Sequence, residues 1–228
     1  MNILFIKKYS NISDEYKPMP AEKNIPDWYK KITPYTGEKN IKEDQMTTAT
    51  IKKCMPVFDS ISAGYLILTY CDIEAIWNND HYEYKYFNIF EPIKSHDSIQ
   101  AVGYPASDEN RKFVSKFMNA WGMKTPEGYS CLFISPMHRN SFINILPGIV
   151  DTDTYNEPVA FPFLVEYCGD NIIIPAGTPI AQVIPFKRDN WSSKFTDDIS
   201  LILKSYSLLK SVFFNGYKKF FWKRKQYL

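Results

Sequence analysis

Short runs of apolar and β-branched residues follow one another through the middle of the chain, and Pro, Gly and polar residues separate them every roughly 8–12 positions. The runs are short and rich in β-branched and aromatic residues, so they predict strands rather than helices. A polar turn at 78–81 separates two runs that form the arms of a hairpin. We therefore predict a mainly β fold, built as a sandwich or barrel. The predicted strands cover 47–53, 65–70, 73–77, 82–87, 129–134, 142–146, 159–165, 172–174 and 180–185.

Two segments show helical spacing instead. The first, 108–121, follows a capping serine or aspartate and ends at Gly122, which predicts a helical insertion in the β fold. The second begins at Thr196 as its N-cap and stops at Asn215–Gly216, which predicts a C-terminal helix. The apolar face of the insertion carries Phe113, Val114, Phe117, Met118 and Trp121, and that of the C-terminal helix carries Ile199, Ile202, Leu203, Tyr206, Leu209 and Phe213.

Prolines at 18, 20, 26 and 34 forbid long helices and central strands in the first 50 residues, although a short helical turn fits 26–30. We therefore divide the chain into an irregular N-terminal arm (1–50), a β domain with its helical insertion (51–190), and a C-terminal helix with a basic, aromatic tail (191–228).

Charge is divided unevenly along these 228 residues. The whole chain has 27 Lys and Arg against 25 Asp and Glu, a formal net charge of +2. From residue 199 onward there are seven basic residues and no acidic one, which leaves −5 on the rest. Such a tail can contact an anionic partner, or it can be an anchored C-terminus whose lysines are simply solvated.

Composition argues against several classes of protein. No stretch approaches 18 uninterrupted apolar residues, and the first residues lack a signal-peptide pattern, so we expect no membrane partner and a cytoplasmic location. The four cysteines include no C-x-x-C pair, which predicts reduced, mostly buried thiols. The three histidines are scattered, so we expect no metal held by the protein itself.

Three segments carry candidate chemistry. In 148–155, Asp151 lies between an apolar run and a turn, where a carboxylate can orient or deprotonate a water molecule, and Tyr155 can present a flat ring to a sugar. In 177–183, the Gln182 amide can reach a phosphate or a backbone group. Gly148 and Gly177 are expected to adopt positive φ at strand–turn junctions. The third segment, 62–65, reads Ser-Ala-Gly-Tyr.

Taken in chain order, segments 62–65, 148–155 and 177–183 resemble the S-A-G-Y-D-L, G-[VI]-I-D-x-D-Y and G-x-x-I-A-Q-[LI] motifs of the dUTP pyrophosphatase and dCTP deaminase superfamily. The resemblance covers residues 55–187. The resemblance implies a β-clip fold and a homotrimer with sites between subunits. It implies that Asp151 activates water, that Tyr155 stacks on the sugar, and that Gln182 contacts phosphate. It also implies a deoxynucleotide partner, with Mg²⁺ held by the nucleotide phosphates. Further candidate nucleotide-binding residues are Arg139, Ser141 and Tyr65.

The sequence departs from that family at chemically important positions. Leu66 replaces the aspartate of the first motif, and Pro136 is followed by Met-His-Arg where the family has Arg-Ser-Gly. A Gly-rich tail that closes over the triphosphate is absent from the sequence. Triphosphate chemistry needs several cations or backbone donors, and only part of that set remains. Structural roles are the alternative for each candidate: turn capping by Asp151, hydrogen bonding by Gln182, and packing by Tyr155.

Three functions fit these observations. The first is a divergent dUTPase-like protein that binds a nucleotide or a protein partner, with catalysis lost or altered. The second is an active deoxynucleoside triphosphate pyrophosphatase or deaminase that uses Asp151. The third is a viral or phage structural or assembly protein that uses the β-clip as a scaffold, located in the host cytoplasm or in the virion. The departures at Leu66 and at 137–138 favour the first and third.

Overall fold

The computed structural model describes residues 1–36, 49–79, 81–88, 90–97, 99, 113–165, 169–212 and 215–228. These residues form two compact units. A β unit combines 1–21 with 64–188, and a second, largely helical unit combines 22–63 with 189–228. The chain therefore leaves the β unit after its first residues, returns to it at Gly64, and leaves again after Arg188.

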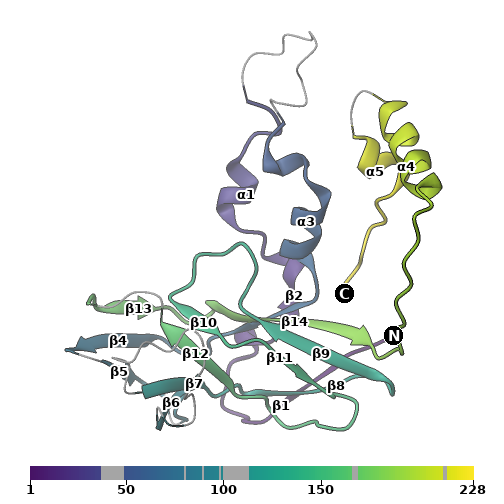
Figure 1. The fold of residues 1–228 in the computed structure, drawn as a ribbon. Coiled ribbons are helices and arrows are strands. Elements are labelled where there is room, and N and C mark those ends of the chain that lie inside the picture. Colours follow the sequence, from purple (N-terminus) through teal and green to yellow (C-terminus); the bar gives the residue numbers. More distant parts are fainter. Residues whose placement is uncertain are drawn as a thin grey trace. The chain divides into compact units, whose positions relative to one another are not determined.

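All the named strands belong to the β unit, and all pair antiparallel (Figure 1). They form sheets of two (β1-β8), four (β10-β12-β7-β6), five (β11-β9-β14-β3-β2) and three (β13-β4-β5) strands. This confirms the mainly β fold and the hairpin around 78–81. The strands are β1 (Leu4–Lys7), β2 (Met19–Pro20), β3 (Tyr65–Leu68), β4 (Ile73–Asn78), β5 (His81–Tyr86), β6 (Ile93–Asp97), β7 (Phe113–Phe117), β8 (Trp121–Lys124), β9 (Tyr129–Ile134), β10 (Ile143–Ile145), β11 (Gly148–Val150), β12 (Phe161–Val165), β13 (Ile172–Ile174) and β14 (Pro179–Lys187).

The five-stranded sheet positions the candidate residues. Its longest strand, β14, pairs with β9 on one side and with β3 on the other. Ala181, Gln182 and Val183 in the middle of β14 are completely buried, as is Leu66 opposite them on β3. A strand buried on both faces reads as a continuous apolar run, which is why β14 was recognisable from the sequence.

The predicted helical insertion at 108–121 is wrong where the structure describes it. Residues 113–117 form β7 and 121–124 form β8, while 108–112 lie outside the described residues. Phe113 and Phe117 are four residues apart, a spacing that shares one face in a helix and also one face in a strand. Phe117 is fully buried and pairs with both Ile93 and Phe161. The spacing alone fits a helix and a strand equally well, and pairing within the four-stranded sheet makes this segment a strand.

A smaller correction concerns the first predicted strand, 47–53. Residues 47 and 48 lie outside the described residues, and Ile51–Lys53 form a 3₁₀ helix, η3. The Thr50 hydroxyl accepts a hydrogen bond from the Lys52 N–H at 3.3 Å and so caps that helix. A threonine that favours strands by its branching here favours a helix start by its hydroxyl.

The second unit contains short helices. They are η2 (Ala21–Lys23, which spans the boundary with the β unit), α1 (Asp27–Lys31), η3, α3 (Met55–Ser62), α4 (Ser200–Lys210) and α5 (Gly216–Phe220), while η1 (Asp14–Tyr16) belongs to the β unit. Helix α1 is the turn predicted at 26–30, with Pro26 as its N-cap. Tyr29 of α1 is buried, and its ring lies 6.1 Å from that of Phe58 of α3.

The predicted C-terminal helix is confirmed, but it runs from Ser200 to Lys210. It therefore begins later than Thr196 and ends before Asn215–Gly216, where the separate helix α5 starts instead. The Thr196 hydroxyl accepts from the Asp198 N–H at 3.1 Å, and Asp198 Oδ1 in turn accepts from the Ser200 N–H at 2.9 Å. These two turns occupy the residues that the sequence assigned to the first turn of the helix. Seven apolar side chains on or beside α4 are between 37% and 75% exposed: Ile199, Leu201, Ile202, Leu203, Tyr206, Leu208 and Leu209.

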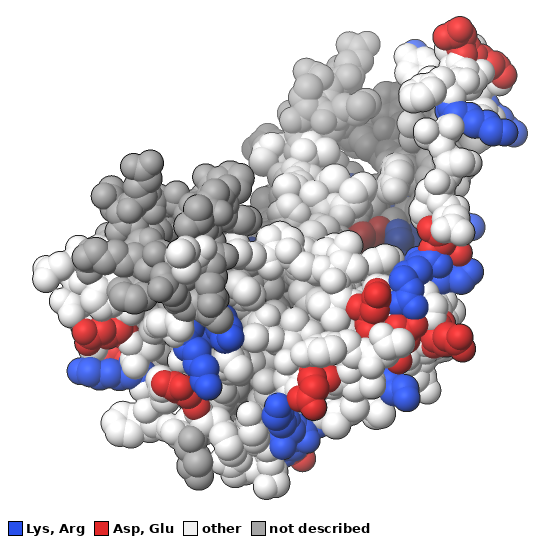
Figure 2. Space-filling view, turned by 60° about the horizontal axis from the view of Figure 1, so that its bottom comes forward, with Lys and Arg blue, Asp and Glu red and all other residues white. Residues whose placement is uncertain are grey.

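Basic and acidic side chains alternate in small groups on the face of the β unit drawn in Figure 2. In the part of the chain that the structure describes, no helix has both the length and the apolar content needed to cross a bilayer.

Candidate functional site

The turn after β11 carries the two aspartates of the 148–155 segment. The N–H groups of Thr154 and Tyr155 donate to the Asp151 carbonyl oxygen at 3.1 and 2.9 Å. Thr152 is fully buried, and its hydroxyl oxygen lies 2.9 Å from that of Thr125. Thr152 therefore holds the turn against the β unit, while the Asp151 side chain stays 62% exposed.

Arg188, the residue after β14, joins both aspartates. Its Nη1 lies 3.2 Å from Asp151 Oδ1 and 2.9 Å from Asp153 Oδ1, and its Nη2 donates to Asp153 Oδ2. The Ser130 hydroxyl also donates to Asp151 Oδ1, at 2.6 Å. One oxygen of the predicted catalytic carboxylate is thus occupied by a cation and by a hydroxyl.

Asp153 is held more tightly than Asp151. Its side chain is only 4% exposed, and Oδ2 accepts the Gly128 N–H at 2.9 Å as well as the Arg188 guanidinium. The hydrogen bonds from Arg188 lower the pKa of the Asp153 carboxyl to about 2; burial acts in the opposite direction, and the Gly128 N–H adds to the lowering. Asp153 therefore serves as a charged anchor for this turn.

Gln182 lies inside the five-stranded sheet. It is completely buried in β14, and its Oε1 accepts the Met137 N–H at 2.9 Å. That hydrogen bond holds the loop between β9 and β10 against the central strand. The residue after Met137, His138, has a φ of 57°, a left-handed conformation that few non-glycine residues adopt.

Arg139 and Ser141 lie in the same loop. Arg139 is half-buried, and burial lowers the pKa of its guanidinium, which stays charged at neutral pH. The Ser141 hydroxyl accepts from the Ile143 N–H at 3.2 Å and donates to the Ile143 carbonyl at 2.7 Å. Ser141 therefore closes the loop onto β10.

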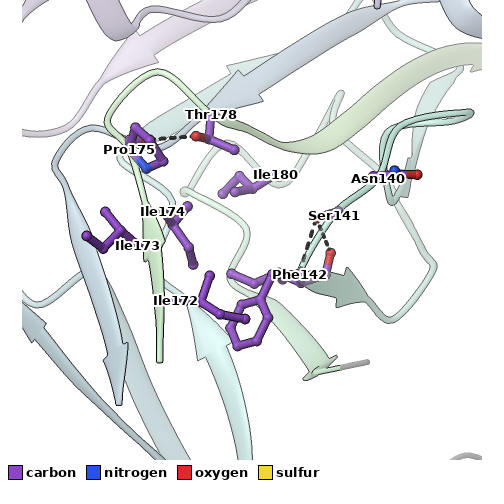
Figure 3. A pocket seen from close by; sticks show the side chains of 10 residues that line it. Asn140, Ser141, Phe142, Ile172, Ile173, Ile174, Pro175, Thr178 and Ile180 are labelled. Carbon is purple, nitrogen blue, oxygen red and sulfur yellow. Dashed lines mark hydrogen bonds between the residues drawn. The ribbon is translucent and has the colours of Figure 1, made fainter. Parts of the chain in front are cut away.

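Next to this loop lies a pocket of about 140 Å³ (Figure 3). Its walls come from the loop and β10 on one side and from β13 and the start of β14 on the other. Of the predicted site residues, only Ser141 lines it.

Tyr65 lies on a third strand, β3, opposite Val183 of β14. Its half-buried ring packs edge-on against Phe5, with 5.2 Å between the ring centres. The next residue, Leu66, is completely buried, so the position where the family carries an aspartate belongs to the core here.

The candidates therefore form two groups. Asp151 and Tyr155 share one turn, and that turn contacts Ser130 near the start of β9. Gln182 lies opposite Ile134, at the end of the same strand. The step from Ser130 to Ile134 along an extended strand corresponds to roughly 14 Å. Within one copy of the chain, the two groups do not converge.

The carboxylates offer little to a metal ion. Both oxygens of Asp153 and one oxygen of Asp151 are bonded to Arg188. Among the described residues, no group of three or more His, Cys, Asp or Glu side chains is placed to hold a metal ion.

Sequence reasoning missed Arg188 and Ser130. Both are far from Asp151 in the sequence, by 37 and 21 residues, and no local pattern links them. Of the two predicted positive-φ glycines, Gly177 is confirmed with a φ of 82°, whereas Gly148 lies outside the left-handed region. Gly64 was missed, although its φ is 65°.

No family model matches the sequence, and neither does any curated protein. Among solved structures, the chain is similar to the dUTPase from phage phi11 of S. aureus, with 13% identity, 88% of this chain and 99% of that chain covered, and a TM-score of 0.35. It is also similar to the Staphylococcus bacteriophage 80alpha dUTPase, with 14% identity, 86% of this chain and 97% of that chain covered, and a TM-score of 0.33. These structures are of the family that the sequence motifs resemble. At this TM-score and identity, the likeness transfers no activity and no residue role.

Proposed function

We propose that this chain is a dUTPase-like β protein that binds a nucleotide without using Asp151 to hydrolyse it. The observation that carries the proposal is the contact of Asp151 Oδ1 with both the Arg188 guanidinium and the Ser130 hydroxyl. A general base must be free to take a proton from water, and Asp151 Oδ1, which already accepts two hydrogen bonds, is a poor one. This leaves only Oδ2 of that carboxylate for the task. The arrangement favours loss of hydrolysis over its retention.

Two further positions, in the motifs that resemble those of the dUTPase-like superfamily, support the same proposal. Leu66 and Gln182 are both completely buried, one as core and the other as the acceptor for the Met137 N–H. Neither presents a group at the surface to a phosphate chain. The motifs therefore serve the fold, which explains how their order persists while their chemistry is incomplete.

Two features remain to bind a nucleotide, one exposed and one half-buried. The Tyr155 ring is 50% exposed beside the Asp151 turn and offers a stacking surface to a sugar or base. Arg139, in the loop that Gln182 holds, offers a guanidinium to a phosphate. If the chain assembles as the homotrimer that the motif resemblance implies, the two groups come from different subunits. Any Mg²⁺ would enter with the nucleotide phosphates.

The proposal is tested by thermal shift with dUTP, dCTP and dATP, with and without Mg²⁺, alongside chromatographic detection of released pyrophosphate. We expect a raised melting temperature with at least one nucleotide and no turnover. Asp151→Asn should bind as the wild type does. Turnover that Asp151→Asn abolishes would overturn the proposal, as would the absence of a shift with every nucleotide. Light scattering on the same samples measures the oligomeric state, expected to be trimeric.

A protein partner is the second candidate, because apolar side chains on α4 are exposed. Leu201 is 75% exposed and Ile202 is 68% exposed on a helix that carries no acidic residue. Exposed apolar surface of this kind marks interaction sites. The double variant Leu201→Ser/Ile202→Ser should abolish capture of any partner from host lysate, while Ser200→Ala should not. Equal capture by both variants would reject this candidate.

A further inference from the structure

Helix α4 has no buried residue, although more than half of its side chains are apolar. At 3.6 residues per turn, the apolar residues on and beside it form two rows on different sides of the helix, and together they extend over more than half of its circumference. The first row consists of Ile199, Ile202, Leu203, Tyr206 and Leu209, and the second of Leu201 and Leu208. A helix that is apolar on several sides requires an apolar environment.

Helix α5 packs against α4 and leaves most of these rows open. Figure 1 shows the two helices as a pair near the C-terminal end of the chain. Gly216 of α5 lies beside Leu209, which is 40% exposed. In the first turn of α4, by contrast, Leu201 is 75% exposed and Ile202 is 68% exposed. The most open apolar surface is therefore the beginning of α4.

The segment that contains α4 and α5 is also basic and aromatic. Residues 199–228 include seven Lys and Arg and no Asp or Glu. The ammonium of Lys210 lies 4.5 Å from the ring centre of Tyr206, and that of Lys218 lies 5.8 Å from that of Trp222. Exposed Leu and Ile next to Lys, Tyr and Trp are typical of helices that lie in the boundary between the headgroups and the acyl chains of an anionic bilayer.

The length of α4 fits a location along a bilayer surface. Its 11 residues correspond to about 16 Å, against about 30 Å for the hydrocarbon core of a bilayer. The sequence-based expectation of no membrane partner rested on the lack of an 18-residue apolar run, which is a condition for spanning only. A groove on a folded protein covers one side of a helix, whereas acyl chains adapt to several sides. A bilayer therefore accounts for both apolar rows.

We propose that α4 and α5 bind the surface of an anionic lipid bilayer. The apolar rows of α4 enter the boundary between headgroups and acyl chains, and lysines of the 199–228 segment contact the lipid phosphates. The apolar rows supply affinity for any bilayer, and the lysines supply the preference for anionic lipid. This interaction is independent of nucleotide binding, because it uses the second unit, whereas Asp151, Tyr155 and Arg139 belong to the β unit.

Flotation of the full chain with two kinds of vesicle tests the inference: phosphatidylcholine alone, and an equimolar mixture of phosphatidylcholine and phosphatidylglycerol. We expect binding to the mixed vesicles to be at least tenfold tighter at low salt, and this preference to fall at high salt. Leu201→Ser/Ile202→Ser should weaken binding to the mixed vesicles at least tenfold. Ile149→Ser/Ile173→Ser, a matching change at positions of the β unit that are 65% and 70% exposed, should leave it unchanged.

A charge variant tests the lysines separately. Lys218→Gln/Lys219→Gln leaves the apolar rows of α4 intact and should reduce the preference for mixed vesicles severalfold. It also keeps the inference testable if Leu201→Ser/Ile202→Ser loses its helix, which circular dichroism would show. Lys85→Gln/Lys124→Gln, at exposed lysines of the β unit, is the control and should retain the full preference.

Three outcomes would overturn the inference. Equal binding to the two kinds of vesicle would exclude the role of the lysines. Binding that both test variants retain would place the bilayer contact elsewhere on the chain. Absence of binding to either vesicle would leave the surface of α4 to the protein partner considered above. Nucleotide thermal shifts of the two test variants should equal those of the wild type, so this inference and the proposed function fail separately.

Discussion

The Arg188 guanidinium donates to both carboxylate oxygens of Asp153, a side chain only 4% exposed. This pair joins the end of β14 to the turn after β11, and the Gly128 N–H joins the same carboxylate to the turn before β9. The end of β14, the turn after β11 and the turn before β9 therefore meet at the Asp153 carboxylate. Paired two-point hydrogen bonds between arginine and a carboxylate are among the strongest that side chains form.

Stability at low pH should depend on Asp153. Its folded-state pKa is about 2 against an ordinary value of 3.8, so its charge favours the folded state. That contribution is complete above the ordinary value and is lost as the pH falls from there toward 2. In urea unfolding, Asp153→Asn should lower the free energy of unfolding more at pH 6 than at pH 2.5. Asp170→Asn, at an exposed carboxylate, is the control. An equal loss at both pH values for Asp153→Asn would contradict the assignment.

Gly64 should be irreplaceable, for a reason independent of its place in the motif. Its φ is 65°, and a Cβ built there would lie 1.9 Å from the Val183 carbonyl oxygen of β14. A left-handed residue with a side chain costs about 1–2 kcal/mol, and the backbone clash adds to this. Gly64→Ala should therefore lower the free energy of unfolding by more than about 2 kcal/mol. Gly148→Ala, at the start of β11 and with open space around its Cβ, should change it by less than about 0.5 kcal/mol. Similar losses in the two variants, measured by urea denaturation, would refute this reading.

How far the sequence could predict the fold depends on how local each signal is. Ile172–Ile174 and Tyr129–Ile134 were predicted to the residue, because short apolar runs between turns specify strands locally. Phe113 and Phe117 were assigned to a helix because a four-residue spacing fits both structures, and only the pairing with β6 and β12 separates them. Long-range pairing leaves no trace in a window of ten residues.

The candidate site was less predictable than the fold. The motif order pointed to Asp151, but the pairing of Asp153 with Arg188 spans 35 residues and has no sequence signature. A glutamine within an apolar run, such as Gln182, is compatible with a ligand contact or with a buried structural hydrogen bond. In the structure its side-chain oxygen accepts the Met137 N–H of the neighbouring loop, a contact that the sequence does not signal.

The Asp59 carboxylate, in the second unit, contacts two residues of the C-terminal tail. Both oxygens of Asp59 lie 3.0 Å from Trp222 Nε1, and Oδ2 lies 2.6 Å from Lys225 Nζ, with 19% of the Asp59 side chain exposed. Hydrogen bonds to a charged group contribute about 1.5–3 kcal/mol each. Asp59→Ala should therefore release the tail without unfolding the chain. Limited trypsin digestion read by mass spectrometry should then show faster cleavage at Lys223 and Lys225.

Asp59→Asn keeps one acceptor for the indole and should give an intermediate rate. Asp197→Asn, at an exposed position before α4, should leave the cleavage rate unchanged. Equal cleavage rates in Asp59→Ala and the wild type would mean that the tail is held by other contacts, and that the basic residues there do not depend on Asp59 for their placement.

Thiol reactivity should separate the described cysteines. Cys54 is exposed, whereas Cys71 and Cys131 are buried, and burial raises the pKa of the Cys71 thiol to about 11 and that of Cys131 above its ordinary value. Since the thiolate is the reactive species, a thiol with a pKa of about 11 has a thiolate fraction on the order of one in a thousand at pH 8.

Cys168 lies outside the described residues, so the labelling experiment uses a Cys168→Ser background. There, a disulfide reagent at pH 8 should label one thiol rapidly. Cys54→Ser should remove that fast phase and Cys131→Ser should retain it, while a fast phase that survives Cys54→Ser would show that a buried thiol is accessible through opening of the β unit.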